Sequence, residues 1–224
     1  MDQNLKIAML SIHSSPAGRL GTRDTGGMSV FICETAEVMA KSGNTVDLFT
    51  LAPDLETPQI LELKNNVRLI HLNIGTRKPV AKEQLLDRIN DIFKAFVHFI
   101  FDHDLTYDLI HSHYWLSGIL GVKIQKKFNW HHLITFHTLG AVKNAACKEE
   151  HEPEVRMRNE TSLMQSCNHI ITFTADEKKQ ITRLEPTASG KISIVPCGVN
   201  FEQFKPMDKN EARATLDLHA KFPY

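Results

Sequence analysis

The stretch "KIAMLSIHSSPAGRLGTRDTGG", residues 6–27, joins a short apolar run to a long loop that ends in two adjacent glycines. The run at 6–12 has the length of a strand, and a helical pattern follows over 27–42 and stops at Gly43. A loop between a strand and a helix usually has only a few residues, and longer ones tend to carry function. The stretch therefore predicts a strand, a functional loop and a helix.

The same alternation of short apolar runs with helical patterns continues along the chain. Further helices are expected at 83–102, 115–127, 154–167 and 176–184. Strands that alternate with helices form parallel sheets covered on both faces, so we predict an α/β fold with a Rossmann-like, doubly wound parallel sheet of about seven strands. In the usual strand order the first and fourth strands are neighbours, so the loops after them would flank one crevice. The expected strands are 6–12, 45–51, 67–72, 108–113, 132–138, 169–174 and 191–196.

Length and composition limit the number of domains and the class of partner. A chain of 224 residues is long enough for one large α/β domain and a tail. Its 26 basic and 26 acidic residues are interspersed, which favours a small-molecule partner and no nucleic acid. The chain opens on no leader pattern, its cysteines form no CxxC pair, and no apolar run reaches the ~20 residues of a bilayer span. We therefore expect a cytoplasmic protein with no transmembrane segment.

Gly26 and Gly27 lie where the first loop meets its helix. Without a Cβ atom they let a ligand approach the backbone N–H groups at the helix start, which favour an anion such as a diphosphate or a sugar phosphate. Alternatively, the pair forms a tight turn capped by Asp24 or Thr25 and binds nothing. The spacing matches neither GxGxxG nor GxxxxGK[ST], which disfavours dinucleotide-binding and P-loop sites.

The stretch "DLIHSHYWLSG", residues 108–118, places His111 and His113 on one side of the fourth strand and Tyr114 at its end. Two histidines on one side could bind zinc, but no third ligand lies nearby in the sequence. Hydrogen-bonded histidines beside a ligand crevice are therefore favoured.

Two more stretches carry candidate site residues. "TFHTLGAVKN", residues 135–144, ends the fifth strand with His137 and Thr138. "EVRMRNE", residues 154–160, places Arg156 and Glu160 four positions apart on a helix, a spacing that usually means a solvated surface ion pair. The sequence contains neither a GxSxG motif nor a credible pair of catalytic carboxylates, which disfavours hydrolysis.

Together these motifs resemble the amino-terminal domain of retaining, two-domain nucleotide-sugar glycosyltransferases of family 4, which have the GT-B fold. Within that family the chain is most similar to the D-inositol-3-phosphate glycosyltransferases and the sucrose-phosphate synthase-like enzymes. The resemblance covers about residues 5–206. It rests on "DTGGM", "DLIHSHYWLSG", "FHTLGAVKN" and R-x-R-x-E, followed by "IITFTADEKKQI" and "KISIVPCGVNFEQFKP".

The resemblance implies two Rossmann-like domains that face each other across a cleft. Residues 1–205 correspond to the acceptor-binding domain, and residues 206–224 to a linker and the start of a missing carboxy-terminal donor-binding domain. The 224-residue chain alone is then expected to be inactive. The resemblance implies no metal and no cofactor, and its partners are a UDP- or GDP-linked nucleotide sugar and a phosphorylated small-molecule acceptor.

The resemblance also assigns roles to single residues. Gly26 and Gly27 would face the donor diphosphate, and His137 would be the catalytic residue beside the transferred sugar. The inositol-phosphate enzymes carry asparagine at the position of Ser29, and the shorter serine side chain would leave room for a different polyol or sugar phosphate. The implied acceptor-binding residues are Ser29, Lys82, His113, Tyr114, Thr138 and Arg156, of which Lys82, Tyr114, Thr138 and Arg156 would hold the phosphate.

Two functions remain open at this point. The first is retaining transfer of a sugar from a nucleotide sugar to a phosphorylated polyol or sugar, by a front-face mechanism that needs no carboxylate nucleophile and depends on positioning and electrostatics. The second is a stand-alone sugar-phosphate-binding module, or a catalytically inactive fragment.

Overall fold

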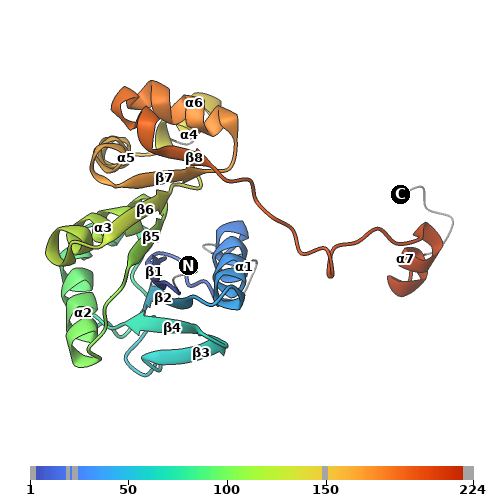
Figure 1. Cartoon of the computed structure of the whole chain (residues 1–224), viewed down its shortest axis with the longest axis horizontal. Helices are drawn as coiled ribbons and strands as arrows, with labels where there is room; N and C mark the ends of the chain where they lie inside the picture. Colours follow the sequence, from blue (N-terminus) through green and yellow to red (C-terminus); the bar gives the residue numbers. More distant parts are fainter. Residues whose placement is uncertain (1–3, 19–20, 22–24, 148–150, 219–224) are drawn as a thin grey trace.

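The computed structural model describes residues 4–18, 21, 25–147 and 151–218. They form an eight-stranded sheet in the order β3-β4-β2-β1-β5-β6-β7-β8 (Figure 1). Neighbouring strands are parallel except for the antiparallel pair β3–β4. The α/β prediction is confirmed. The strands are β1 (Lys6–Leu10), β2 (Thr45–Leu51), β3 (Ile60–Lys64), β4 (Val67–Leu72), β5 (Leu109–His113), β6 (His131–Thr135), β7 (His169–Thr172) and β8 (Ile192–Ile194).

The five predicted helices are present, and the α-helices that pack on the sheet differ from the prediction in two places. The helix expected over 83–102 begins as a short 3₁₀ turn and becomes an α-helix only at Ile89. The second difference is α4, which has only seven residues and therefore too few turns for a visible period. The helices are α1 (Gly27–Lys41), η1 (Lys82–Gln84), α2 (Ile89–Asp102), α3 (Tyr114–Phe128), α4 (Gly140–Ala146), α5 (Glu154–Ser166), α6 (Ala175–Leu184), η2 (Pro186–Lys191) and α7 (Lys209–Thr215).

The central strand β1 is buried on both faces of the sheet. Ile7 and Met9 pack in a cluster with residues of α1, whereas Ala8 and Leu10 pack with residues of α2 and α3. Figure 1 shows α1 on one side of the sheet and α2 and α3 on the other. Because alternate side chains of a strand point to opposite faces, a strand covered on both sides is an unbroken apolar run. This explains why residues 6–12 were identifiable from the sequence.

Seven of the eight strands were predicted from the sequence, and the strand that was not predicted is β3. It forms an edge hairpin with β4, and Asn66 in the turn has a φ of 61°. Asparagine is one of the few residues that tolerate this left-handed conformation. Leu61 is 45 % exposed, and Glu62 is also exposed, so β3 lacks the continuous apolar pattern of the buried strands.

After β8 the chain leaves the sheet and runs to α7, which lies apart from it (Figure 1). No residue of α7 is buried. The interpretation of residues 206–224 as a linker and the start of a second domain stays a prediction. Among the described residues, no helix combines the length and the apolar character that crossing a bilayer requires.

Candidate functional site

The strands β1, β5 and β6 are parallel neighbours, so their carboxyl ends meet at one edge of the sheet. This pairing confirms that the first and fourth predicted strands are adjacent. His13, Tyr114 and His137 follow the three strands, and the rings of His13 and Tyr114 lie 4.4 Å apart. The rings of His113 and His137 are separated by 5.2 Å. We call these four residues the rim.

Two rim residues have strained backbones. Tyr114 has a φ of 74° and His137 a φ of 62°, in the left-handed region that bulky L-residues rarely adopt. Such a conformation costs about 1–3 kcal/mol, and it concentrates at binding and catalytic sites. The strain therefore marks the ends of β5 and β6 as candidate functional positions.

The histidines of β5 are buried and hydrogen-bonded. Nε2 of His111 lies 2.9 Å from Oγ1 of Thr135, and Nδ1 of His113 lies 3.0 Å from Nε2 of His137. Burial lowers the pKa of His111 to about 3 and the pKa of His137 to about 4. Within the described part of the chain, no group of three His, Cys, Asp or Glu side chains is arranged to hold a metal ion.

His13 was not singled out in the sequence, although it follows β1 as Tyr114 follows β5. Burial, together with the positive charge of Lys82, lowers the pKa of His13 to about 3. Its ring is therefore neutral and stacks on Tyr114 without adding charge to the site.

Two cations flank the ring of Tyr114. Nζ of Lys82 lies 4.6 Å from the ring centroid, and Cζ of Arg156 lies 4.7 Å from it. Both distances are within the range of cation–π attraction. Three of the predicted phosphate-binding residues, from η1, α3 and α5, are thus brought together, and the two cations make this end of the site attractive to an anion.

Arg156 is almost completely buried, with 1 % of its side chain exposed. Its Nε donates to Oε1 of Glu160 at 2.6 Å, and its Nη2 donates to both the carbonyl and the hydroxyl oxygen of Thr138. Oε2 of Glu160 accepts from the backbone N–H of Gly140 at 2.9 Å. The expectation of a solvated Arg156–Glu160 surface pair is therefore wrong, because this face of α5 packs against the start of α4.

Glu152 is a further charged neighbour that the sequence analysis missed. Its Oε2 accepts from Nη1 of Arg156 at 2.9 Å, and its Oε1 pairs with Lys143. Its position four residues before Arg156 was the available signal. The Glu152 carboxylate bridges two cations and is itself one-fifth exposed, so it occupies an accessible anion position.

The glycine pair leaves the start of α1 open. The N-cap residue is Gly26, and no side chain caps the helix, so the alternative with Thr25 as the cap is wrong. Asp24 lies outside the described residues. A Cβ atom added at Gly26 or Gly27 would meet nothing within 4 Å. Packing within the described chain therefore does not require these glycines.

The first turns of α1 carry two more side chains near the site. Ser29 is fully buried, and its Oγ lies 3.0 Å from Oγ of Ser14. The role of Ser29 in acceptor binding stays a prediction. Phe31 contacts His113 and His137 edge-on, at 6.0 and 5.5 Å between ring centroids. Phe173, which follows β7, contacts both Phe31 and His137. Aromatic side chains thus cover the histidine pair.

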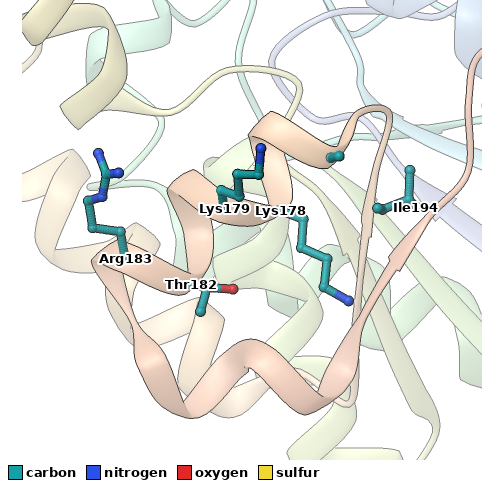
Figure 2. Close-up of a pocket in the computed structure, with 6 residues that line it drawn as sticks. Lys178, Lys179, Thr182, Arg183 and Ile194 are labelled. Carbon is teal, nitrogen blue, oxygen red and sulfur yellow. The ribbon is translucent and has the colours of Figure 1, made fainter.

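A separate hollow lies beside α6, and none of its lining residues belongs to the rim (Figure 2). Lys178 donates to the carbonyl of Ile192 at 3.0 Å, and Lys179 pairs with Asp176 at 3.0 Å. Two of the three cations that line the hollow are therefore already engaged. It is lined by Ala175, Lys178, Lys179, Thr182, Arg183 and Ile194.

The parallel sheet and its helices have the architecture of a Rossmann-like half of the GT-B fold. The chain belongs to Glycosyltransferase Family 4, whose sequence profile matches residues 25–203.

Relatives and solved structures agree with this assignment. The chain is 36% identical over 221 residues to a D-inositol 3-phosphate glycosyltransferase of Nocardiopsis dassonvillei, covering 96% of this chain and 51% of the relative. A protein of the same name from Actinosynnema mirum is 36% identical over 216 residues, covering 95% and 52%. The chain spans about half the length of these curated relatives.

Among solved structures, sucrose-phosphate synthase from Thermosynechococcus elongatus superposes with a TM-score of 0.88 at 30% identity, covering 98% of this chain and 54% of that one. Anabaena HepE, solved in complex with UDP-glucose, superposes with a TM-score of 0.64 at 11% identity, covering 96% and 50%. At that identity the second likeness shows the fold alone.

Proposed function

We propose that this chain is the acceptor-binding half of a retaining glycosyltransferase that transfers a sugar from a nucleotide sugar to a phosphorylated polyol or sugar. The observation that carries the proposal is the pair of cations on Tyr114, Lys82 at 4.6 Å and Arg156 at 4.7 Å, beside the histidine pair at the strand ends. Relatives named D-inositol 3-phosphate glycosyltransferases support a phosphorylated acceptor.

The acceptor's phosphate would bind at Lys82 and Thr138. The Thr138 side chain accepts a hydrogen bond from Arg156 at 3.0 Å, which leaves its own hydroxyl hydrogen to donate to a phosphate oxygen. Arg156 supplies positive charge from behind and orients Thr138. Lys82 is the more accessible cation, so we expect it to make the direct contact.

The donor's diphosphate would approach the open start of α1. Gly26 and Gly27 present backbone there without a Cβ, and the positive end of the helix dipole favours an anion. His137 would lie beside the transferred sugar. We propose a UDP- or GDP-linked donor whose other contacts come from a second domain, with residues 206–224 as the linker toward it.

Retention of configuration is part of the proposal. The two carboxylates beside the Tyr114 cations, Glu152 and Glu160, are both tied to Arg156, which does not suit a nucleophile. A front-face mechanism needs none, because positioning and stabilisation of the departing diphosphate supply the rate enhancement. The 224-residue chain would then bind acceptor without turnover.

A transfer assay tests this function. The whole two-domain protein should transfer sugar from a UDP- or GDP-linked donor to inositol monophosphate or a hexose phosphate, with retained anomeric configuration. His137→Ala should lower kcat at least tenfold. Transfer by the 224-residue chain alone would refute the two-domain cleft, and phosphate-ester binding without transfer by the whole protein would favour the binding module.

A further inference from the structure

His113 and His137 form a histidine–histidine hydrogen bond in which each ring can have only one role. Nδ1 of His113 and Nε2 of His137 lie 3.0 Å apart. Both imidazoles are neutral, because burial lowers both pKa values below the ordinary one. One ring therefore donates its only N–H, and the other ring accepts.

The far nitrogen of His113 decides which ring donates. Nε2 of His113 is buried and has no hydrogen-bond partner. If His113 accepted at Nδ1, its proton would lie on Nε2 as a buried N–H without an acceptor, which costs about 1–3 kcal/mol. A buried N–H without a partner is rarer than an unused acceptor. The proton of His113 is therefore on Nδ1, and His113 donates to His137.

This direction fixes the proton of His137 as well. Because its Nε2 accepts from His113, the proton of neutral His137 must be on Nδ1. His137 is only partly buried, and Nδ1 has no hydrogen-bond partner among the described residues. The ring is held in place by the left-handed backbone and by contacts with Phe31 and Phe173.

We infer that His113 is a positioning residue that holds His137 as the neutral Nδ1–H tautomer. The accessible nitrogen of His137 is then a hydrogen-bond donor and cannot take up the acceptor's proton. This role rests on the proposed function: His137 stabilises an oxygen of the donor sugar or diphosphate, and deprotonation of the acceptor hydroxyl falls to another group. In this role His113, which is fully buried, would not contact the acceptor, in contrast to the acceptor-binding role that the resemblance implies for it.

Nitrogen NMR of the 224-residue chain tests the tautomer without any substrate. Histidine is labelled with ¹⁵N, and the His137 signals are assigned by their loss in His137→Gln. We expect a protonated, pyrrole-type shift at Nδ1 and an unprotonated, pyridine-type shift at Nε2 at pH 7.5. The reverse pattern, or shifts averaged between the two tautomers, would overturn the inference.

Two variants separate hydrogen bonding from packing. In His113→Leu the donor is lost, so we expect His137 to move toward the Nε2–H tautomer that free histidine prefers. The control Phe31→Leu removes a ring contact to His137 and leaves the hydrogen bond, and it should keep the Nδ1–H pattern. A His137 tautomer unchanged in folded His113→Leu would contradict the role of His113.

Kinetics of the whole protein connect the tautomer to transfer. His113→Leu should lower kcat about tenfold, the order of one hydrogen bond, and leave the KM for the phosphorylated acceptor within twofold. An unchanged kcat together with a shifted tautomer would contradict the positioning role. Absence of transfer in the wild-type protein would instead refute the proposed function, and the NMR result would stand independently of it.

Discussion

The sheet carries an arginine–carboxylate cluster at each end, and the two clusters differ in what they leave available. At the amino end, Arg68 binds Asp47 through two hydrogen bonds of 2.8 and 2.6 Å, and the Tyr107 hydroxyl donates to the same carboxylate at 2.5 Å. At the carboxyl end, Arg156 is bound by two glutamates. We call these the amino-end and carboxyl-end clusters.

The amino-end cluster is closed: one carboxylate meets one guanidinium and one phenol, and none of the three has a left-handed backbone. The carboxyl-end cluster contains a second cation on Tyr114, a residue with a φ of 74°. The difference teaches that a buried ion pair by itself does not indicate a binding site. The second cation and the left-handed backbone are what make the carboxyl-end cluster the candidate site.

The largest expected effect is a loss of stability in acid, which involves histidines at both ends of the sheet. Burial holds the pKa of His111 and of His132 at about 3 and that of His113 well below the ordinary 6.5. At a pH between the lowered pKa values of the folded chain and the ordinary value of 6.5, the unfolded chain binds more protons than the folded one. The free energy of unfolding therefore falls as the pH falls. Each such histidine contributes at most about 1.4 kcal/mol for each pH unit below 6, and His13 and His137 act in the same direction.

Urea unfolding at pH 6.0, 5.5 and 5.0, with pH 7.5 as the reference, measures this slope. His132→Gln, near the amino end of β6, keeps a group that can hydrogen-bond to Ser112 and should reduce the slope by about 1.4 kcal/mol per pH unit. A free energy of unfolding that stays constant over this range would contradict the buried neutral histidines.

Asp47→Ala should separate stability from binding. It leaves Tyr107 and Arg68 without their shared acceptor, and Arg68 is partly exposed, so we expect a loss of about 2–4 kcal/mol in the free energy of unfolding. The affinity of the folded variant for a phosphate ester should stay within twofold of wild type. A tenfold loss of that affinity would show that the amino-end cluster also serves the site.

Lys82→Ala should show the opposite pattern. Losing one charge-assisted contact should weaken inositol monophosphate binding about tenfold, with a change in the free energy of unfolding within about 0.5 kcal/mol. Lys123→Ala is the matched control, because Nζ of Lys123 lies 5.5 Å from the ring centroid of Phe93 in a similar contact. Calorimetric titration that finds equal losses for both variants would contradict a direct role for Lys82.

Glu152→Gln should give the smallest effect, a gain. Its negative charge offsets the positive charge that Arg156 offers to an incoming phosphate, so neutralising it should tighten phosphate-ester binding about threefold. Glu154→Gln, which removes an exposed pair with Arg158 on the same helix, should leave the affinity unchanged. Weaker binding in Glu152→Gln would mean that Glu152 orients Arg156 for the ligand.

The parts of the fold that could be predicted from the sequence are those whose side chains are buried on both faces. Strand β1 and its pairing with β5 follow from unbroken apolar runs and the usual strand order. The edge strand β3 could not be predicted in this way, because none of its residues is buried and its pattern mixes leucine with charged residues.

The sequence predicted which residues lie at the candidate site, but not their backbone conformation or their burial. His137 and Tyr114 could be placed at strand ends, yet their left-handed backbones depend on tertiary contacts. Arg156 and Glu160 have a spacing equally compatible with a surface pair, and only the packing of α5 against Gly140 buries them. His13 and Glu152 could have been found by their positions after β1 and before Arg156.

The central claim is that the carboxyl-end cluster binds a phosphorylated acceptor, and one calorimetric measurement tests it most directly. The wild-type chain is titrated with inositol monophosphate and a hexose 6-phosphate, and in parallel with the unphosphorylated inositol and hexose. At least one phosphate ester should bind, and its unphosphorylated counterpart should bind at least tenfold more weakly. Equal affinity for the two forms, or no binding of either ester, would contradict the account.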